Sequence, residues 1–193
     1  MQTVYLMRHG EVENPHDIWY GNLKGFPLSA AGREQIKKAA EKLKATGVYV
    51  TTLVHSPRLR TTQSAEVAAH VLDVGDVVAD DRLREWHTGS WEGRPTKDLY
   101  EKSGYFGTPM RIPGPETLED MSARVREAVD QARRKHPDGD ILIVGHREPL
   151  ASFMMALLKQ KWEKIHDFDL PRAAVWKIVY DDKSRVSGVQ RVI

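Results

Sequence analysis

Short apolar runs alternate with longer amphipathic stretches along this chain, and this alternation limits its fold more than any other feature. Residues 3–7, 51–55 and 141–144 are rich in β-branched and other apolar side chains, a pattern typical of strands buried on both faces. Between them, apolar residues recur at helical spacing in 30–44 and 116–136. Strands that alternate with helices predict an α/β protein, a three-layer α/β/α sandwich with a mostly parallel central sheet.

Local signals mark where the helices start. Ser29 is a candidate N-cap for the helix at 30–44. Ser56, followed by Pro57 at the first helical position, predicts a second helix that runs to about residue 72. The other expected elements are a strand at 77–79, a short helix at 96–102, a helix at 149–159 and a closing pair of strands at 175–180 and 186–192. The long loop at 9–28 is rich in Gly, Pro, Asn and aromatic residues, as functional loops often are.

The composition bounds the class of protein. With 193 residues, 40% of them hydrophobic and 29% charged, we expect one soluble globular domain over residues 1–193. The net charge of +2 does not require a nucleic-acid partner. No apolar run approaches the ~20 residues that cross a bilayer, and the first residues lack a signal-peptide pattern. The lack of cysteine excludes disulfides and thiolate chemistry. We therefore expect a cytoplasmic protein without nucleic-acid or membrane partners, and homo-oligomer formation is left open.

Histidines and arginines follow the expected strands. Arg8 and His9 come directly after the first apolar run, His146 follows 141–144, and Arg60 lies in the first turn of the helix after the second strand. Ligands of open α/β sheets bind beyond the carboxyl ends of the strands, and helix N-termini attract anions. A histidine nucleophile beside guanidinium groups that neutralise phosphoryl oxygens is what phosphoryl transfer without a metal needs.

Other chemistries are weighed against this one. Glu85 and Glu92 both lie beside Trp and Gly, and the residue pattern alone does not choose which carboxyl acts as an acid. A zinc site made by His9, His146 and Glu85 is conceivable, but no helical ligand pair of the His-Glu-x-x-His type is present. The absence of a phosphate loop and of a Gly-x-Gly-x-x-Gly motif disfavours nucleotide-cofactor chemistry.

With these segments in order, the chain resembles the histidine phosphatase superfamily, the phosphoglycerate mutase-like proteins. The matching segments are Arg8-His9-Gly10-Glu11, residues 27–33 at the entry to the first helix, residues 56–65, residues 83–93, and Val144-Gly145-His146. The resemblance covers nearly the whole chain. It implies that His9 becomes a phosphohistidine and that His146 assists, while Arg8 and Arg60 bind the phosphoryl group. It also implies that Glu85, rather than Glu92, is the proton donor, and that neither a metal nor another cofactor is needed.

A few positions depart from the family pattern. Val12 stands where the family often has Thr or Ser, and the usual Asn comes one position early, as Asn14. Arg147 replaces a frequent Gly and is followed by Glu148, a negative charge near the expected phosphate unless it pairs with an arginine. Asn14 and Arg147 are candidate substrate-binding residues.

The resemblance and the short chain favour a phosphomonoester hydrolase that acts on a small phosphorylated metabolite. Family mutases often carry longer insertions between the second arginine and the second histidine. Two alternatives stay open: a cofactor-dependent phosphoglycerate mutase, and a non-catalytic phosphate-binding protein that keeps these residues without turnover.

Overall fold

The computed structural model describes residues 1–107, 110–111 and 113–193, which form a six-stranded sheet in the order β3-β2-β4-β1-β5-β6. The strands are β1 Gln2–Arg8, β2 Val50–His55, β3 Asp76–Ala79, β4 Asp140–Gly145, β5 Val175–Tyr180 and β6 Val186–Arg191. Strands β3, β2, β4 and β1 run parallel, and β5 and β6 complete one edge as antiparallel strands. The expected mostly parallel sheet is confirmed.

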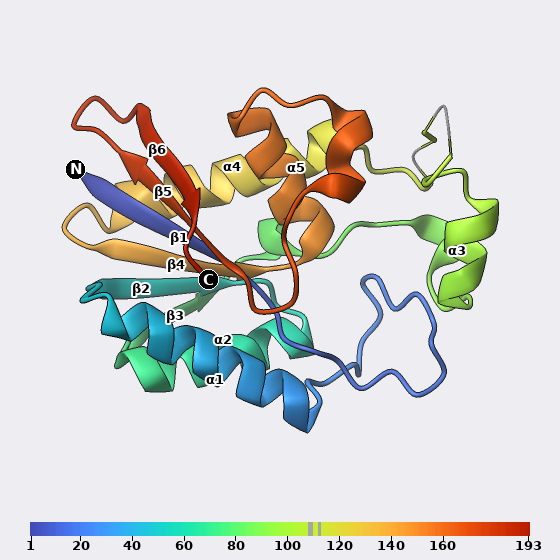
Figure 1. Cartoon of the computed structure of the whole chain (residues 1–193), viewed down its shortest axis with the longest axis horizontal. Coiled ribbons are helices and arrows are strands. Elements are labelled where there is room, and N and C mark those ends of the chain that lie inside the picture. Colours follow the sequence, from blue (N-terminus) through green and yellow to red (C-terminus); the bar gives the residue numbers. More distant parts are fainter. Residues whose placement is uncertain (108–109, 112) are drawn as a thin grey trace.

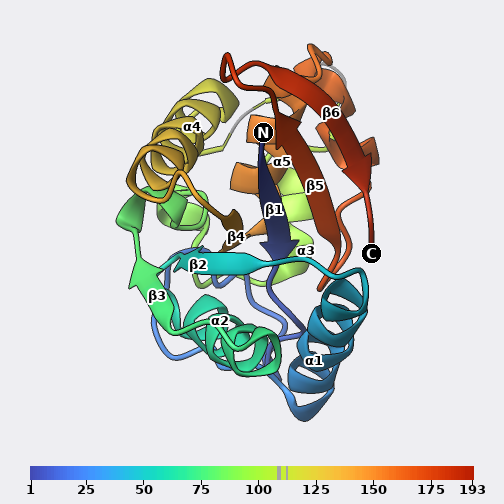
Figure 2. The same cartoon turned by 90° about the vertical axis from the view of Figure 1, so that its left-hand side faces the viewer.

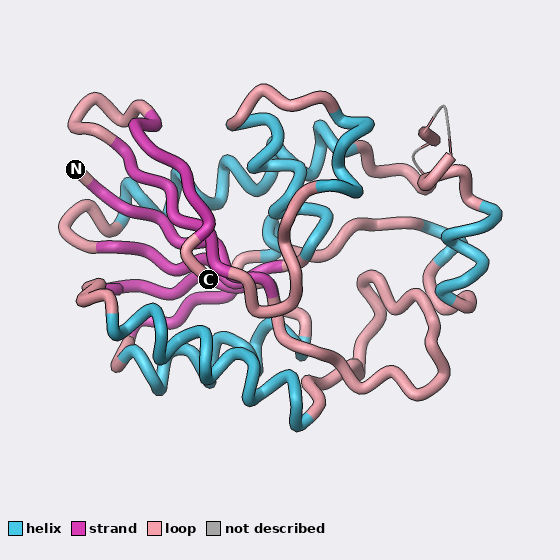
Figure 3. Tube along the Cα trace, in the orientation of Figure 1, coloured by secondary structure: helices cyan, strands magenta, loops and turns pink. Residues whose placement is uncertain are grey.

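Helices cover both faces of the sheet, as Figures 1 and 2 show. Helices α1 (Ala30–Ala45) and α2 (Leu59–Leu72) pack on one face, and α4 (Leu118–Lys135) and α5 (Arg147–Leu157) pack on the other. The short helix α3 (Thr96–Lys102) lies apart from both layers, beyond the carboxyl ends of the parallel strands and near the long loop between β1 and α1 (Figure 3). No helix in the described part of the chain is long and apolar enough to cross a membrane.

The central strands are apolar throughout because both faces of the sheet are covered. In β1, Val4 and Leu6 join the core under α4 and α5, while Tyr5 and Met7 join the core under α1 and α2. Alternate side chains of a strand point to opposite faces. In a strand between two helical layers, the side chains on both faces are therefore buried and apolar. This is why the first apolar run lacks the alternation of a half-exposed strand.

Two helix starts differ from the sequence-based expectation. Helix α2 begins at Leu59 with Arg58 as its N-cap, so the prediction of Ser56 as the N-cap is wrong. Ser56 continues the line of β2, since its backbone N–H donates to the Val144 carbonyl at 3.1 Å. Helix α5 begins at Arg147, two residues earlier than expected. A proline is tolerated throughout the first turn of a helix, so Pro149 did not mark its first residue. The Ser29 cap of α1 is confirmed, because its side chain accepts from the Gly32 N–H.

A buried ion pair ties α4 to the loop that follows β3. Arg124, on the buried side of α4, donates from Nε to Glu116 Oε1 at 2.6 Å and from Nη2 to Glu116 Oε2 at 3.2 Å. Its Nη1 also donates to the carbonyls of Arg82 and Arg84, at 2.6 and 2.7 Å. Arg124 and Glu116 are each 8% exposed. The pair therefore fixes the backbone that leads into Glu85.

Replacement of Arg124 by Met should lower the free energy of unfolding by about 3–5 kcal/mol, because Glu116 would stay buried without its main partner. Urea denaturation followed by circular dichroism measures this loss. Arg134→Met, on the exposed side of the same helix, is the matched control and should change stability by less than about 0.5 kcal/mol. Equal effects of the two substitutions would contradict this role for Arg124.

Candidate active site

The register of two parallel strands brings the two histidines together. Arg8 at the end of β1 pairs with Gly145 at the end of β4, and the next residue on each strand is a histidine. The backbone N–H of His9 donates to the Gly145 carbonyl at 3.0 Å, and the ring centroids of His9 and His146 are 5.3 Å apart. The site is thus built at the carboxyl edge of the sheet, as the strand-end pattern predicted.

His9 is held as a neutral imidazole with one nitrogen free. Its ring is 1% exposed, and its Nδ1 lies 2.7 Å from the Gly10 carbonyl. A carbonyl only accepts hydrogen bonds, so Nδ1 carries the proton and Nε2 keeps its lone pair. Burial, together with the positive charges of Arg60 and Arg8, holds the pKa of His9 well below its usual range. Gly10 allows this loop to pack on α1, because a Cβ there would clash with the Gly32 carbonyl.

Two guanidinium groups, one buried and one half-buried, supply positive charge beside His9. Arg60 is 1% exposed, donates from Nη2 to the Gly21 carbonyl at 2.8 Å and lies 4.6 Å from the centroid of the Tyr20 ring. Arg8 donates from Nη1 to the Leu170 carbonyl at 2.9 Å. The Nε–H groups of both arginines are buried and have no hydrogen-bond partner among the described residues. These donors can bind an oxyanion with charge-assisted hydrogen bonds.

His146 and Ser56 lie buried beside His9 and are bonded to each other. His146 is fully buried at the N-terminus of α5, and its Nε2 lies 2.8 Å from Ser56 Oγ. Burial and the charge of Arg60 hold the pKa of His146 well below its usual range. Ser56 was predicted to be a helix cap. The structure shows instead that it orients the ring of His146.

Glu85 is the carboxyl group that faces these residues. Its Oε2 lies 3.5 Å from His146 Nδ1 and 3.7 Å from Arg60 Nη2, and its Oε1 accepts from the Trp86 N–H at 2.9 Å. Burial, reinforced by the negative charge of Glu148 and partly offset by Arg60, raises the pKa of Glu85 to about 7. A carboxyl with this pKa holds a proton at neutral pH often enough to act as an acid.

Glu92, the other candidate acid, lies away from the two histidines. Its Oε1 is 3.4 Å from His87 Nδ1, and its side chain does not line the cavity that contains His9 and Glu85. Asn22, from the loop between β1 and α1, donates to the carbonyls of Glu85 and Trp86 at 2.8 and 3.1 Å. The two candidate acids are therefore separated by the fold, and only Glu85 reaches the histidines.

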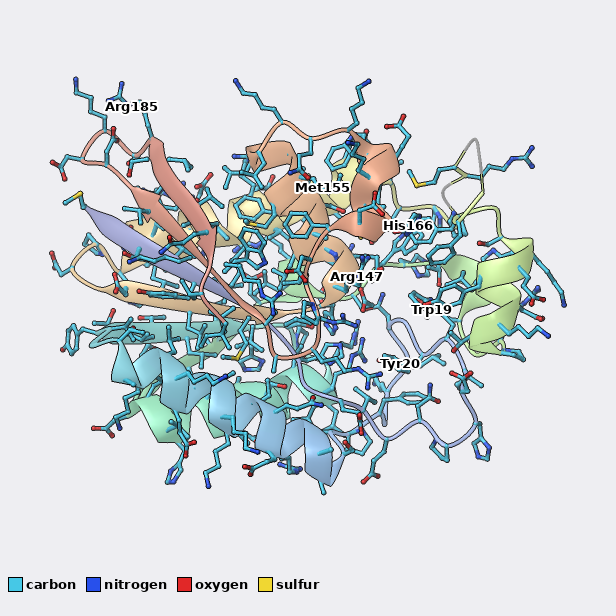
Figure 4. All side chains as sticks on the ribbon, viewed as in Figure 1. Trp19, Tyr20, Arg147, Met155, His166 and Arg185 are labelled. Atoms are coloured by element: carbon cyan, nitrogen blue, oxygen red, sulfur yellow. The ribbon has the colours of Figure 1, made fainter. Side chains whose placement is uncertain are left out.

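A cavity of about 170 Å³ opens over His9 and Glu85, and Asn14 and Arg147 line it. Both side chains also form hydrogen bonds with backbone groups of the protein. Asn14 donates to and accepts from the backbone of Ile18, at 2.9 and 3.2 Å. Arg147 donates to the carbonyls of Ile165 and His166, each at 3.0 Å. Figure 4 labels Arg147 and His166, which lie near each other. Their assigned roles in substrate binding stay predictions.

The structure also shows where the two other departures from the family pattern, Glu148 and Val12, lie. Glu148 lines the cavity and pairs with Arg147 at 3.0 Å, so its charge is partly neutralised. Val12 is buried in a β-bridge with Leu28 and packs the loop instead of facing a ligand.

Sequence reasoning did not single out other residues that line the cavity, notably Tyr20, Tyr100 and Arg172. Tyr20 belongs to the loop at 9–28, whose aromatic content already indicated a functional loop. Arg172, which pairs with Glu11 at 3.2 Å, and Tyr100 follow no motif, so no local signal marks them.

Ligand atoms of His9, Glu85 and His146 all lie within 4.8 Å of one another, a spacing that a metal ion can use. The same site also holds the charged groups of Arg8 and Arg60. Two fixed cations repel a metal ion and attract an oxyanion, so the electrostatics of the site favour phosphate.

The chain is similar to several known proteins in sequence and in fold. The chain is similar to the protein named "Probable phosphoglycerate mutase GpmB" of Proteus mirabilis, with 32% identity over 165 residues, which is 82% of this chain and 75% of that protein. Among solved structures, a mycobacterial glucosyl-3-phosphoglycerate phosphatase, Rv2419c, aligns with a TM-score of 0.81 at 22% identity, over 100% of this chain and 98% of the other. A phosphoserine phosphatase of Entamoeba histolytica in complex with 3-phosphoglyceric acid aligns with a TM-score of 0.79 at 19% identity, over 100% and 98%.

At these identities the two structures show a shared fold and no more. The family model of the histidine phosphatase superfamily (branch 1) matches residues 4–190, nearly the whole chain. The resemblance stated from the motifs is confirmed, and the chain belongs to the histidine phosphatase superfamily.

Proposed function

We propose that residues 1–193 form one catalytic domain, a metal-independent phosphomonoester hydrolase that acts through a phosphohistidine intermediate on a small phosphorylated metabolite. The observation that carries this proposal is the state of His9. Its Nδ1 is fixed as a donor to the Gly10 carbonyl, and its free Nε2 shares a site with the guanidinium groups of Arg8 and Arg60 and a carboxyl of raised pKa. A nucleophile, an oxyanion site and an acid are the three groups that this chemistry requires.

The residues divide the reaction into two steps. In the first, Nε2 of His9 attacks phosphorus, the bond from phosphorus to the alcohol oxygen breaks, and Glu85 gives its proton to that oxygen. In the second, water attacks the phosphohistidine, its proton goes to the Glu85 carboxylate, and neutral His9 and inorganic phosphate are released. Arg8, Arg60 and His146 bind the equatorial oxygens through both steps, where their fixed dipoles and charges stabilise the transition state.

A phosphoglycerate mutase is the second candidate, because relatives at about 30% identity carry that name. Both reactions would form a phosphohistidine, so product analysis separates them. Incubation with 3-phosphoglycerate should release inorganic phosphate if the chain is a hydrolase that accepts this substrate, and should give 2-phosphoglycerate if it is a mutase. A general aryl phosphate, followed by a panel of phosphorylated metabolites, tests for turnover. Binding of phosphate with no turnover of any of them would favour a non-catalytic protein.

Replacement of His9 by Ala should lower kcat by at least about 10⁴-fold, since loss of a catalytic nucleophile can cost ~10⁶-fold. Release of inorganic phosphate from an aryl phosphate measures it. His87→Ala removes an exposed imidazole outside the cavity and should keep the wild-type rate. A His9→Ala variant with more than about a tenth of that rate would show that the nucleophile is another group.

Replacement of Glu85 by Gln should lower kcat/KM on an alkyl phosphate by about 10²–10⁴-fold. The loss on nitrophenyl phosphate should be far smaller, because nitrophenolate leaves without a proton. Glu92→Gln is the matched control and should affect neither substrate. Equal losses on both substrates, or a larger loss for Glu92→Gln, would place the acid elsewhere.

The pH profile of kcat/KM reports the same group in the free enzyme. The acid must be protonated, so with the Glu85 pKa raised to about 7, kcat/KM on the alkyl phosphate should fall as the pH rises above about 7. This alkaline limb should disappear in Glu85→Gln. A limb that persists in the variant would belong to another residue.

Activity should survive excess EDTA, because Arg8, Arg60 and His146 supply the positive charge and hydrogen bonds that a metal supplies in other phosphotransferases. The rate on an aryl phosphate is measured after dialysis against the chelator, with and without added Zn²⁺. A complete loss that Zn²⁺ restores would instead support a metal bound by His9, Glu85 and His146.

A further inference from the structure

Two exposed aromatic rings are stacked on each other next to the catalytic cavity. Tyr100 of α3 is 51% exposed and Phe106 is 40% exposed. Their ring centroids are 4.3 Å apart, and the ring planes differ by 13°. Large aromatic side chains that are exposed next to each other form an apolar surface. Such surfaces commonly mark the binding site of a ligand or of another protein.

Tyr100 belongs to the catalytic cavity as well as to the surface. It lines the cavity together with Thr96, one helical turn earlier, so this face of α3 points toward His9 and Glu85. The start of α3 is fixed to the long loop, because the Thr96 N–H donates to the Asp17 carbonyl at 2.8 Å. A side chain that lines the cavity and is half exposed lies at its mouth.

The second ring is anchored to the same wall. Phe106 packs against the ring of His166 with centroids 4.2 Å apart, and His166 Nε2 lies 3.0 Å from the Tyr105 carbonyl. Arg147, which lines the cavity, donates to the His166 carbonyl at 3.0 Å. Figure 4 labels both Arg147 and His166 on this side of the molecule. The stacked pair is therefore held in place relative to the nucleophile.

The residues around His9 suit the phosphoryl group, and the aromatic lining residues suit the alcohol part of a substrate. Arg8, His9 and Glu85 are the lining residues that carry the proposed chemistry, whereas Ile18, Trp19, Tyr20 and Tyr100 are the aromatic and aliphatic lining residues. A volume of about 170 Å³ leaves little room beyond the phosphoryl group, so the alcohol part of a substrate extends out past the mouth. Two of the charged lining groups are already paired, Arg172 with Glu11 and Glu148 with Arg147.

Resting on the proposed hydrolase function, we propose that Tyr100 determines specificity by stacking on the alcohol part of the substrate. The preferred substrates are then phosphomonoesters whose alcohol carries a flat, apolar or aromatic group a short distance from the phosphoryl oxygen. Phe106 supports the ring of Tyr100 from behind.

Matched esters test this assignment. Ethyl phosphate and 2-phenylethyl phosphate both release a primary alcohol of similar basicity, so their chemistry is alike and only the second carries a ring. Wild-type kcat/KM should be about tenfold higher for 2-phenylethyl phosphate, the size expected of one aromatic pair. Tyr100→Ala should reduce this preference to about twofold or less, and Tyr100→Phe should retain it.

Tyr49→Ala is the matched control, since Tyr49 is 75% exposed and precedes β2 at the opposite end of the sheet. It should leave both rates unchanged. A wild-type ratio near one, or equal losses on both esters in Tyr100→Ala, would overturn the assignment while leaving the hydrolase proposal intact.

A binding measurement separates the two proposals further. In a His9→Ala background, calorimetry should show about tenfold tighter binding of 2-phenylethylphosphonate than of ethylphosphonate, and Tyr100→Ala should remove the difference. If neither ester nor any aryl phosphate is hydrolysed, the hydrolase proposal fails. The phosphonate comparison then still decides the role of Tyr100, because equal binding of the two phosphonates would reject it.

Discussion

The parallel register between β1 and β4 is the constraint on which the rest of the site depends. Arg8 opposite Gly145 places His9 and His146 in ring contact, and both then reach Glu85 and Arg60. A shift by one residue would turn every side chain of β1 to the other face of the sheet, which would break two cores as well as the site. The packing that stabilises the fold and the geometry that positions the chemistry are therefore the same set of contacts.

Burial gives these groups their chemical character. Removal from water, together with two nearby guanidinium groups, keeps both histidines neutral, so that His9 has a lone pair to offer. The same burial raises the pKa of Glu85 to about 7 and makes it an acid. Arg8 and Arg60 stay charged in a buried site, a state that an incoming dianion favours because it brings the opposite charge. The electrostatics of the site thus favour a substrate that carries negative charge.

The fold and the main residues of the site were predictable from the sequence because their signals are local. Buried strands read as continuous apolar runs, and residues at strand ends such as His9 and His146 meet when their strands are parallel neighbours in the sheet. The Arg124–Glu116 pair, the contact between Ser56 and His146, and the position of Tyr100 were not predictable. The Ser56–His146 contact and the position of Tyr100 depend on segments far apart in the chain, whose approach no local pattern encodes. Arg124 and Glu116 are close in the sequence, but Arg124 also bonds the distant carbonyls of Arg82 and Arg84, which no local pattern predicts. The start of α2 was misplaced for the same reason, since the Ser56 N–H donates to the Val144 carbonyl of β4 and α2 begins only at Leu59.

The central claim of this account is that phosphate is carried covalently on His9. The most direct measurement is mass spectrometry of peptides from enzyme mixed with an aryl phosphate, quenched in base within milliseconds, where a phosphohistidine survives. The account predicts a phosphate on the peptide that contains His9, at Nε2, which appears and decays at rates compatible with turnover. Phosphate on the peptide that contains His146, or on Glu85, would contradict it. So would full turnover with no covalent phosphate at any time point.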